Sequence, residues 1–247
     1  MSWKQSPIIL DAELPLYQRK RQVTQLSNSA SQYPIERHDV KFHRQACELP
    51  QKQAVTQEEQ TSGQQSKSPR MHLQQGLLEI YCGDGKGKTT AALGLALRAA
   101  GCGLRVHIVQ FLKGTETGEL ASLAQIPQIS LVRCDKNWGF TFSMTEQDKK
   151  EITVCHNQML QEAISMAKSG EIDVLIFDEF QAAYAHGLLD KETAKDFILK
   201  KPATLELVLT GRNPDPVFLE AADYVSEIHG VRHPYQKQIP ARKGIEF

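Results

Sequence analysis

The feature that most constrains this sequence is a glycine-rich segment at residues 83–90, Gly-Asp-Gly-Lys-Gly-Lys-Thr-Thr. It follows an apolar run at residues 77–81 that has the length and composition of a buried strand. Residues 90–100, which come next, are rich in alanine and leucine and favour a helix. A strand, a glycine loop and a helix in this order predict one unit of an α/β fold.

The spacing within this segment is that of a phosphate-binding loop. The glycines let successive backbone N–H groups point at one anion, and the following helix N-terminus adds partial positive charge. Lys88 can reach phosphate oxygens, and the Thr89 hydroxyl can bind Mg²⁺. In the pattern G-x-x-x-x-G-K-[ST], Cys82 stands where the first glycine belongs and Gly83 falls one place late, so the loop is a variant. The residues expected to bind nucleotide here are Gly83, Asp84, Gly85, Lys86, Gly87, Lys88, Thr89 and Thr90.

A glycine-rich turn without a ligand is the alternative, and the strand and helix on either side favour the phosphate site over it. Residues 83–92 resemble the loop of the P-loop type ATP:corrinoid adenosyltransferases. The resemblance runs from about residue 76 to residue 247, includes Val-Gln-Phe-Leu-Lys-Gly at residues 109–114, and ends in residues 241–247, which are similar to the family's terminus. It implies transfer of the 5′-deoxyadenosyl group of ATP to the Co(I) of a corrinoid, in adenosylcobalamin biosynthesis or salvage.

Four further apolar runs of strand length, at residues 104–111, 129–132, 174–177 and 205–209, alternate with segments of helical character. Ser143 with Glu146 resembles a capping box and predicts a helix that extends to about Lys168. Residues of this helix that recur at helical spacing and should face the core are Ile152, Cys155, Met159, Ala163 and Ala167. The pattern predicts an α/β fold of the P-loop NTPase type, with a mostly parallel sheet covered by helices on both faces.

The first 70 residues differ in composition from the rest. Residues 51–68 are mostly Gln, Ser, Thr, Glu and Lys, and such a segment buries too little apolar area to offset its chain entropy. We therefore expect a largely disordered N-terminal extension at residues 1–70 and an adenosyltransferase domain at residues 71–247, with Met71 as an alternative start. In the family a short N-terminal segment can fold over the active site of the partner subunit, but no segment here matches it.

Charge and cysteine content exclude some other functions. Lys+Arg and Asp+Glu both number 29, so the composition gives no support to nucleic-acid binding. No apolar run is long enough to cross a bilayer, and the N-terminus lacks the apolar stretch of a secretion signal, so we expect a cytoplasmic protein that binds no membrane. The five cysteines are odd in number and form no C-x-x-C pair, which predicts free thiols in a reducing compartment.

An acidic pair, Asp178 and Glu179, comes directly after the strand predicted at residues 174–177. Ligands of parallel sheets lie beyond the carboxyl ends of the strands, so both side chains should come near Thr89. Mg²⁺ prefers such oxygen ligands together with phosphate and water. The alternative is an acid pair that only interacts with a helix dipole. The family resemblance points to Glu179 and Thr89 as the magnesium contacts, with Asp178 beside them.

Two aromatic residues, Phe140 and Phe142, lie in a loop before the predicted long helix. On residue type alone such a pair is more often a packing feature than a functional one. A Gly-Phe-Thr-Trp segment of the family matches here, and in the family it presses on the corrinoid, displaces the lower ligand of cobalt and eases its reduction to Co(I). This chain has Phe142 where the family usually has Trp, which makes Phe140 the safer assignment.

In the reaction that the resemblance implies, reduced cobalt is itself the nucleophile, so no nucleophilic side chain is needed. The protein holds the reacting groups in line and stabilises the triphosphate leaving group. Lys88 suits that role, Lys86 is a weaker candidate, and Arg212 is either a bidentate phosphate ligand or a surface residue. The expected partners are ATP, a corrinoid, a reductase as electron donor and a second copy in a homodimer. The alternatives are a P-loop kinase for a small molecule and a nucleotide-dependent protein that binds or delivers a corrinoid.

Overall fold

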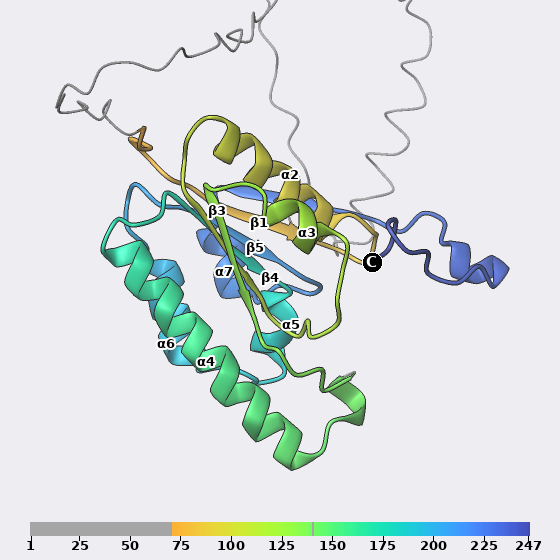
Figure 1. Cartoon of the computed structure of the whole chain (residues 1–247). Helices are drawn as coiled ribbons and strands as arrows, with labels where there is room; N and C mark the ends of the chain where they lie inside the picture. Colours follow the sequence, from red (N-terminus) through yellow and green to blue (C-terminus); the bar gives the residue numbers. More distant parts are fainter. Residues whose placement is uncertain (1–70, 140) are drawn as a thin grey trace, which may run out of the picture. The chain divides into compact units, whose positions relative to one another are not determined.

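The computed structural model describes residues 71–139 and 141–247; the predicted extension at residues 1–70 and Phe140 lie outside them. Six strands form one sheet in the order β3-β2-β4-β5-β1-β6, and every neighbouring pair is parallel (Figure 1). The strands are β1 (Leu78–Cys82), β2 (Val106–Gln110), β3 (Ile129–Arg133), β4 (Val174–Asp178), β5 (Glu206–Thr210) and β6 (Tyr224–Glu227). The five strands predicted from the sequence are confirmed, and β6 was not predicted.

Helices cover both faces of this sheet, as the alternating pattern predicts (Figure 1). On one face lie α2 (Lys88–Gly101) and the short α3 (Glu119–Leu123). The other face carries α4 (Glu146–Lys168), α5 (Phe180–Ala185), α6 (Lys191–Leu199) and α7 (Pro216–Ala221). Two short 3₁₀ helices are η1 (Thr141–Ser143) and η2 (Pro234–Lys237). The arrangement is a parallel α/β fold.

Each face has its own apolar core, and together they fix the strands whose ends carry the site. On the α2 face small residues such as Ala92 and Ala96 pack on Ile108 and Ile176, which brings the helix close to the sheet. On the opposite face the core is aromatic, and the rings of Phe177 and Phe180 stack with centroids 5.7 Å apart. Every residue of β2 and β4 is buried, so these two strands lie in the interior with little freedom to shift.

The long helix α4 ends at Lys168 as predicted, but its cap differs from the prediction. Thr145 is the N-cap, and its hydroxyl accepts from the backbone N–H of Asp148 while the Asp148 carboxylate accepts from the N–H of Thr145. The capping box therefore lies two residues later than the predicted pair of Ser143 with Glu146. The predicted core face is confirmed: its residues are buried, except Cys155, which is partly buried against the same core.

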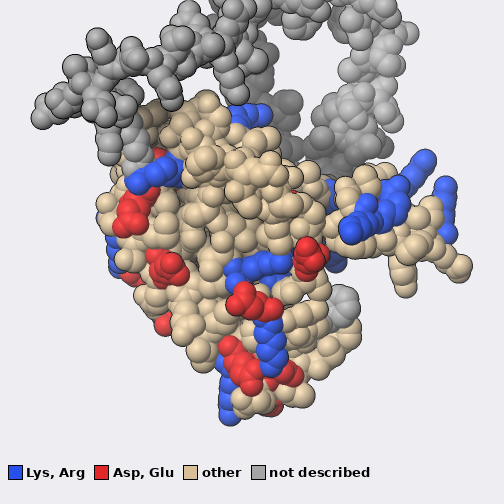
Figure 2. Space-filling view, in the orientation of Figure 1, with Lys and Arg blue, Asp and Glu red and all other residues tan. Residues whose placement is uncertain are grey.

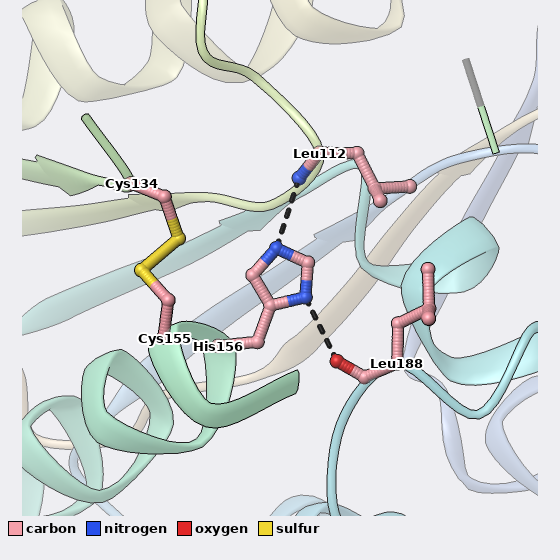
Figure 3. The surroundings of a disulfide bond; sticks show 5 residues. All are labelled: Leu112, Cys134, Cys155, His156 and Leu188. Carbon is pink, nitrogen blue, oxygen red and sulfur yellow. Dashed lines mark hydrogen bonds between the residues drawn. A yellow bond between two sulfur atoms is a disulfide. The ribbon is translucent and has the colours of Figure 1, made fainter. Parts of the chain in front are cut away.

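The prediction of free thiols is wrong for two of the cysteines. Cys134, just after β3, forms a disulfide with Cys155 of α4 (Figure 3). Cys134 is buried, and the two side chains come from elements adjacent on one face of the sheet, which spacing along the sequence does not reveal. Among the described residues Cys82 and Cys102 are free.

On the main body of the face drawn in Figure 2, positive and negative side chains lie close to one another, whereas the projection on the right shows only positive ones. Over the whole sequence the numbers of basic and acidic residues are equal. Within residues 71–139 and 141–247, no helix combines the length and the apolar character that crossing a membrane requires.

Candidate active site

The loop at residues 83–87 is shaped by the segment that follows the edge strand β6. Gly83 has φ of 100°, and a Cβ at this position would lie 2.2 Å from the carbonyl oxygen of Ile228. The same carbonyl accepts a hydrogen bond of 2.8 Å from the N–H of Gly85, and the N–H of Ile228 donates to the carbonyl of Cys82 at 2.8 Å. Only glycine fits at position 83, because both the left-handed backbone and the close approach exclude a side chain.

Lys88 begins α2 and folds back over the loop. Its Nζ donates to the carbonyl oxygens of Gly83 and Gly85, both at 2.8 Å, and the residue is only 9% exposed. The ammonium is thereby fixed inside the curve of the loop, at the helix N-terminus where backbone N–H groups lack helical partners. An anion that enters the loop meets a positive charge already in position.

Asp178, the last residue of β4, is the centre of the polar network beside the loop. It is 1% exposed and accepts hydrogen bonds on both carboxylate oxygens. Oδ1 accepts from the hydroxyls of Thr89 at 2.9 Å and Thr210 at 2.7 Å. Oδ2 accepts from Nζ of Lys113 at 2.6 Å and from Nε2 of Gln110 at 3.3 Å. Thr89 and Asp178 lie close together, as predicted, because α2 starts beside the carboxyl end of β4.

Glu179 follows in the left-handed region, with φ of 56° and ψ of 22°, and is the residue before α5. Its backbone N–H donates to the hydroxyl of Thr210 at 2.9 Å, which holds this uncommon conformation in place. Burial raises the pKa of the Glu179 carboxyl, the charge of Asp178 raises it further, and Lys113 opposes both. The carboxyl group is therefore placed where a cation would stabilise its charged form.

The oxygen atoms of this network suit a hard divalent cation. The Thr89 hydroxyl lies within hydrogen-bond distance of the Asp178 carboxylate, and Glu179 adds a second acid next in sequence. Across residues 71–139 and 141–247, no group of three or more His, Cys, Asp or Glu side chains could hold a metal ion by themselves. Such a donor set fits Mg²⁺, which usually takes one or two carboxylates and fills its remaining positions with phosphate and water.

A cavity of about 700 Å³ opens above the loop and the acidic pair. This volume is within the range of small-molecule sites, roughly 300–1,000 Å³. The sequence-predicted residues that line it are Asp84, Gly85, Lys86, Gly87, Lys88, Thr89, Thr90, Glu179 and Arg212. Gly83 and Asp178 are not part of the lining, and Asp178 acts from behind it through the Thr89 hydroxyl.

The C-terminal tail closes one side of this cavity. Residues 244–247 line it together with the loop, and the Glu246 carboxylate pairs with Nζ of Lys86 at 3.0 Å. Arg242 binds the same carboxylate at 3.0 Å, and chiefly through this contact the pKa of Glu246 falls to about 2. Glu246 therefore stays ionised at neutral pH and ties the tail to the loop.

The aromatic segment lies outside the cavity lining. Phe142 in η1 is 87% exposed. Phe140 lies outside the described part of the chain. The preceding Trp138 is partly buried and packs on the core of the α4 face. The segment thus has one end in the core and one large apolar side chain in solvent.

Four residues that the structure brings into or next to the site were missed as functional residues: Gln110, Lys113, Thr210 and His156. Gln110 and Lys113 belong to the segment at residues 109–114, whose family resemblance was noted without a role for any side chain. Thr210 ends β5, directly before the glycine that precedes Arg212. Gln110, Lys113 and Thr210 follow or end parallel strands, and this position was the signal that could have identified them.

A parallel sheet with a phosphate-binding loop after β1 and an acidic pair at the carboxyl end of β4 defines a nucleotide-binding α/β protein. Within that class, the chain belongs to the ATP:corrinoid adenosyltransferase family BtuR/CobO/CobP, whose family model matches residues 74–247.

Several relatives support this assignment. The corrinoid adenosyltransferase of Pseudomonas aeruginosa is 33% identical over 175 residues, covering 70% of this chain and 85% of that protein. Its counterpart in Escherichia coli K12 is 31% identical over 174 residues, with 70% of this chain and 87% of that protein covered. The corrinoid adenosyltransferase of Salmonella typhimurium is 30% identical over 174 residues, with the same two shares covered.

Proposed function

We propose that this protein transfers the 5′-deoxyadenosyl group of ATP to the Co(I) of a corrinoid. The observation that supports this most directly is the cavity in which Lys88, Thr89 and Glu179 meet, in a chain of the adenosyltransferase family. In the reaction the electron pair of Co(I) attacks C5′ of ATP and a Co–C bond forms. The bond from C5′ to the phosphate oxygen breaks, and its electron pair leaves with triphosphate.

The protein's part in this step is to bind and stabilise the leaving triphosphate. Lys88 and the backbone N–H groups of the loop offer positive charge fixed before the reaction begins, which is the arrangement that lowers the barrier for a departing anion. Lys86 and Arg212 line the same cavity and add further positive charge. Lys86 must first exchange its partner Glu246 for a phosphate, so we assign to Lys88 the larger part of the stabilisation of the leaving triphosphate.

We assign Thr89, Asp178 and Glu179 to a magnesium site. Mg²⁺ bound there would neutralise charge on the triphosphate as it leaves. The three residues serve this without rearrangement of the backbone, because the Thr89 hydroxyl already lies 2.9 Å from the Asp178 carboxylate. Glu179 is lined up on the cavity side of the same strand end.

We assign the corrinoid contact to the segment that carries Phe140 and Phe142. Phe142 is a large apolar side chain held 87% exposed, and covering it with the flat apolar face of a macrocycle would remove that area from water. Displacement of the lower cobalt ligand by such a side chain would make Co(II) easier to reduce. A reductase then supplies the electron for Co(I).

The same proposal places the protein in the cytoplasm as a homodimer. The exposed edge strand β6 and the segment after it present large apolar side chains, including Tyr224, Val225, Val231 and Tyr235, which suits a contact with a second copy. ATP is abundant in the cytoplasm, where Co(I) is also protected from oxidants. The Cys134–Cys155 disulfide is uncommon for that compartment, and the burial of Cys134 restricts its reduction.

The decisive experiment mixes the protein with ATP, Mg²⁺ and chemically reduced cobalamin and follows the visible spectrum of the Co–C product together with released triphosphate. We expect Lys88→Ala to lose at least about 100-fold in turnover, since its charge acts on the leaving group. Lys149→Ala is the matched control, because Lys149 pairs with Glu146 at 2.7 Å on the exposed side of α4. ADP and a phosphorylated acceptor as products, or wild-type turnover in Lys88→Ala, would overturn the assignment.

A further inference from the structure

Lys113 is placed where the magnesium site would be. Its Nζ lies 2.6 Å from Oδ2 of Asp178 and 3.3 Å from the hydroxyl oxygen of Thr89. The side chain is 22% exposed and lines the nucleotide cavity, whereas Asp178 is buried behind it. A positive charge thus stands beside the same two oxygen-bearing residues that suit a divalent cation, and it compensates the buried carboxylate.

The backbone conformation before Lys113 directs its side chain toward Asp178 and Thr89. Leu112 has φ of 57°, a left-handed conformation that a residue with a branched side chain adopts only when held. Its N–H donates to Nε2 of His156 at 3.2 Å, and Nδ1 of that ring bonds the carbonyl of Leu188 at 2.8 Å (Figure 3). On the other side, the N–H of Phe111 donates to the carbonyl of Asp178 at 3.0 Å. The turn is therefore fixed on both sides, and the lysine leaves it toward the cavity.

An ammonium and a divalent cation repel each other at such short distance. A metal that binds Thr89 and Asp178 therefore displaces the ammonium from at least one of them. The nearest new anion in the same cavity is the nucleotide phosphate that arrives with the metal. The lysine has a flexible stem and an open side toward the cavity, so it can make this exchange without backbone movement.

We propose that Lys113 is a further phosphate-binding lysine, which holds the cation position in the nucleotide-free protein and passes to a phosphate oxygen when the metal–nucleotide complex binds. This inference rests on the proposed function, since it assigns a further residue to the same site. The proposal predicts opposite changes in two affinities. Without Lys113, the protein binds the metal alone more tightly and binds the nucleotide more weakly.

The test measures two affinities in Lys113→Met by calorimetry, that of Mn²⁺ alone and that of ATP with saturating Mg²⁺. We expect Mn²⁺ to bind at least about tenfold more tightly and ATP at least about tenfold more weakly than in the wild type. Lys113→Arg keeps the charge and should leave Mn²⁺ affinity near the wild-type value while recovering part of the ATP affinity. Lys149→Met, which removes an ion-paired lysine from the surface of α4, should change neither.

A structural role for Lys113 would weaken both affinities together, and a lysine without a role would leave both unchanged; either result overturns the proposal. A second measurement needs no variant: amine acetylation of the wild-type protein, mapped by mass spectrometry. Mn²⁺ alone should raise the labelling of Lys113, and ATP added with Mg²⁺ should lower it again. Unchanged labelling at saturating Mn²⁺ would contradict the exchange. Neither measurement uses a corrinoid, so a failure of adenosyl transfer would count against the proposed function and not against this inference.

Discussion

At the scale of single residues, some buried polar side chains hold the backbone in place. His156 is 1% exposed, and the Nε2 and Nδ1 atoms of its ring bond the N–H of Leu112 and the carbonyl of Leu188. This pairing needs a neutral ring with its proton on Nδ1, because Nε2 accepts. Burial lowers the pKa of His156 to about 4. The buried His107, bonded to Ser130 at 2.8 Å, shows the same direction of shift.

These shifts predict a fold that loses stability in mild acid. Between pH 6.5 and 4 the His156 ring binds a proton in the unfolded chain but not in the folded chain. The free energy of unfolding therefore falls as the pH falls. For His156 the loss between pH 7 and pH 4 is on the order of 3 kcal/mol. Urea unfolding across this range would measure it. His156→Gln, whose amide keeps one donor and one acceptor, should show a shallower dependence, and an identical slope would contradict the assignment.

The place of some site residues could be predicted from the sequence, and the place of others could not. Lys88 and Thr89 are fixed by a motif with its own spacing, and Asp178 by its place at a strand end. Lys113 comes three residues after the end of β2, and the left-handed turn at Leu112 directs it back to Asp178. Backbone conformation of a non-glycine residue in that region is decided by tertiary contacts, which a local pattern does not encode.

At the scale of elements, the predictions were confirmed where a segment buries one face or both. The buried strands and the apolar stripe of α4 have clear patterns, so their existence followed from the sequence. The edge strand β6 has all four side chains exposed, and its pairing with β1 through backbone hydrogen bonds leaves no trace in side-chain pattern. The disulfide was missed for a related reason, since it joins residues 21 apart in sequence that only the packing of α4 beside β3 brings together.

The segment between β3 and α4 offers a prediction at this scale. It is attached at one end by the Cys134–Cys155 bond and at the other by the Thr145 cap, and Phe142 projects between them. If this side chain aids reduction of cobalt, Phe142→Ala should slow turnover several-fold when Co(II) and a weak reductant are supplied. With Co(I) already formed it should be near wild type, because the phosphate site is untouched.

Because Phe142 is exposed, the melting temperature of Phe142→Ala should stay within about 1 °C of the wild type. Phe142→Trp should match or exceed the wild type in the assay with weak reductant, since it restores the larger side chain usual in the family. Equal losses of Phe142→Ala in both assays would remove the segment from the reduction step.

At the scale of the whole molecule, the family match and the composition divide the chain at nearly the same point. The match covers residues 74–247, and the low-hydrophobicity stretch ends just before it, at residue 68. We therefore expect a protein that starts at Met71 to keep the thermal transition and the adenosyl transfer of the full chain. Differential scanning calorimetry of both forms tests this. A clearly lower transition in the shorter form would show that residues 1–70 pack on the domain.

The position of the C-terminal tail has a practical consequence for anyone who handles this protein. Phe247 lines the same cavity as Lys88, so a peptide tag fused after Phe247 would begin at the edge of that cavity and compete with any ligand for its space. Immobilisation through the C-terminal end would also place strain on the ion pair between Glu246 and Lys86. Cys102 is a better attachment point: its thiol is free and exposed, and it follows α2 at the end remote from Lys88, about 20 Å along the helix axis. A maleimide dye or surface linker attached to Cys102 leaves the cavity open.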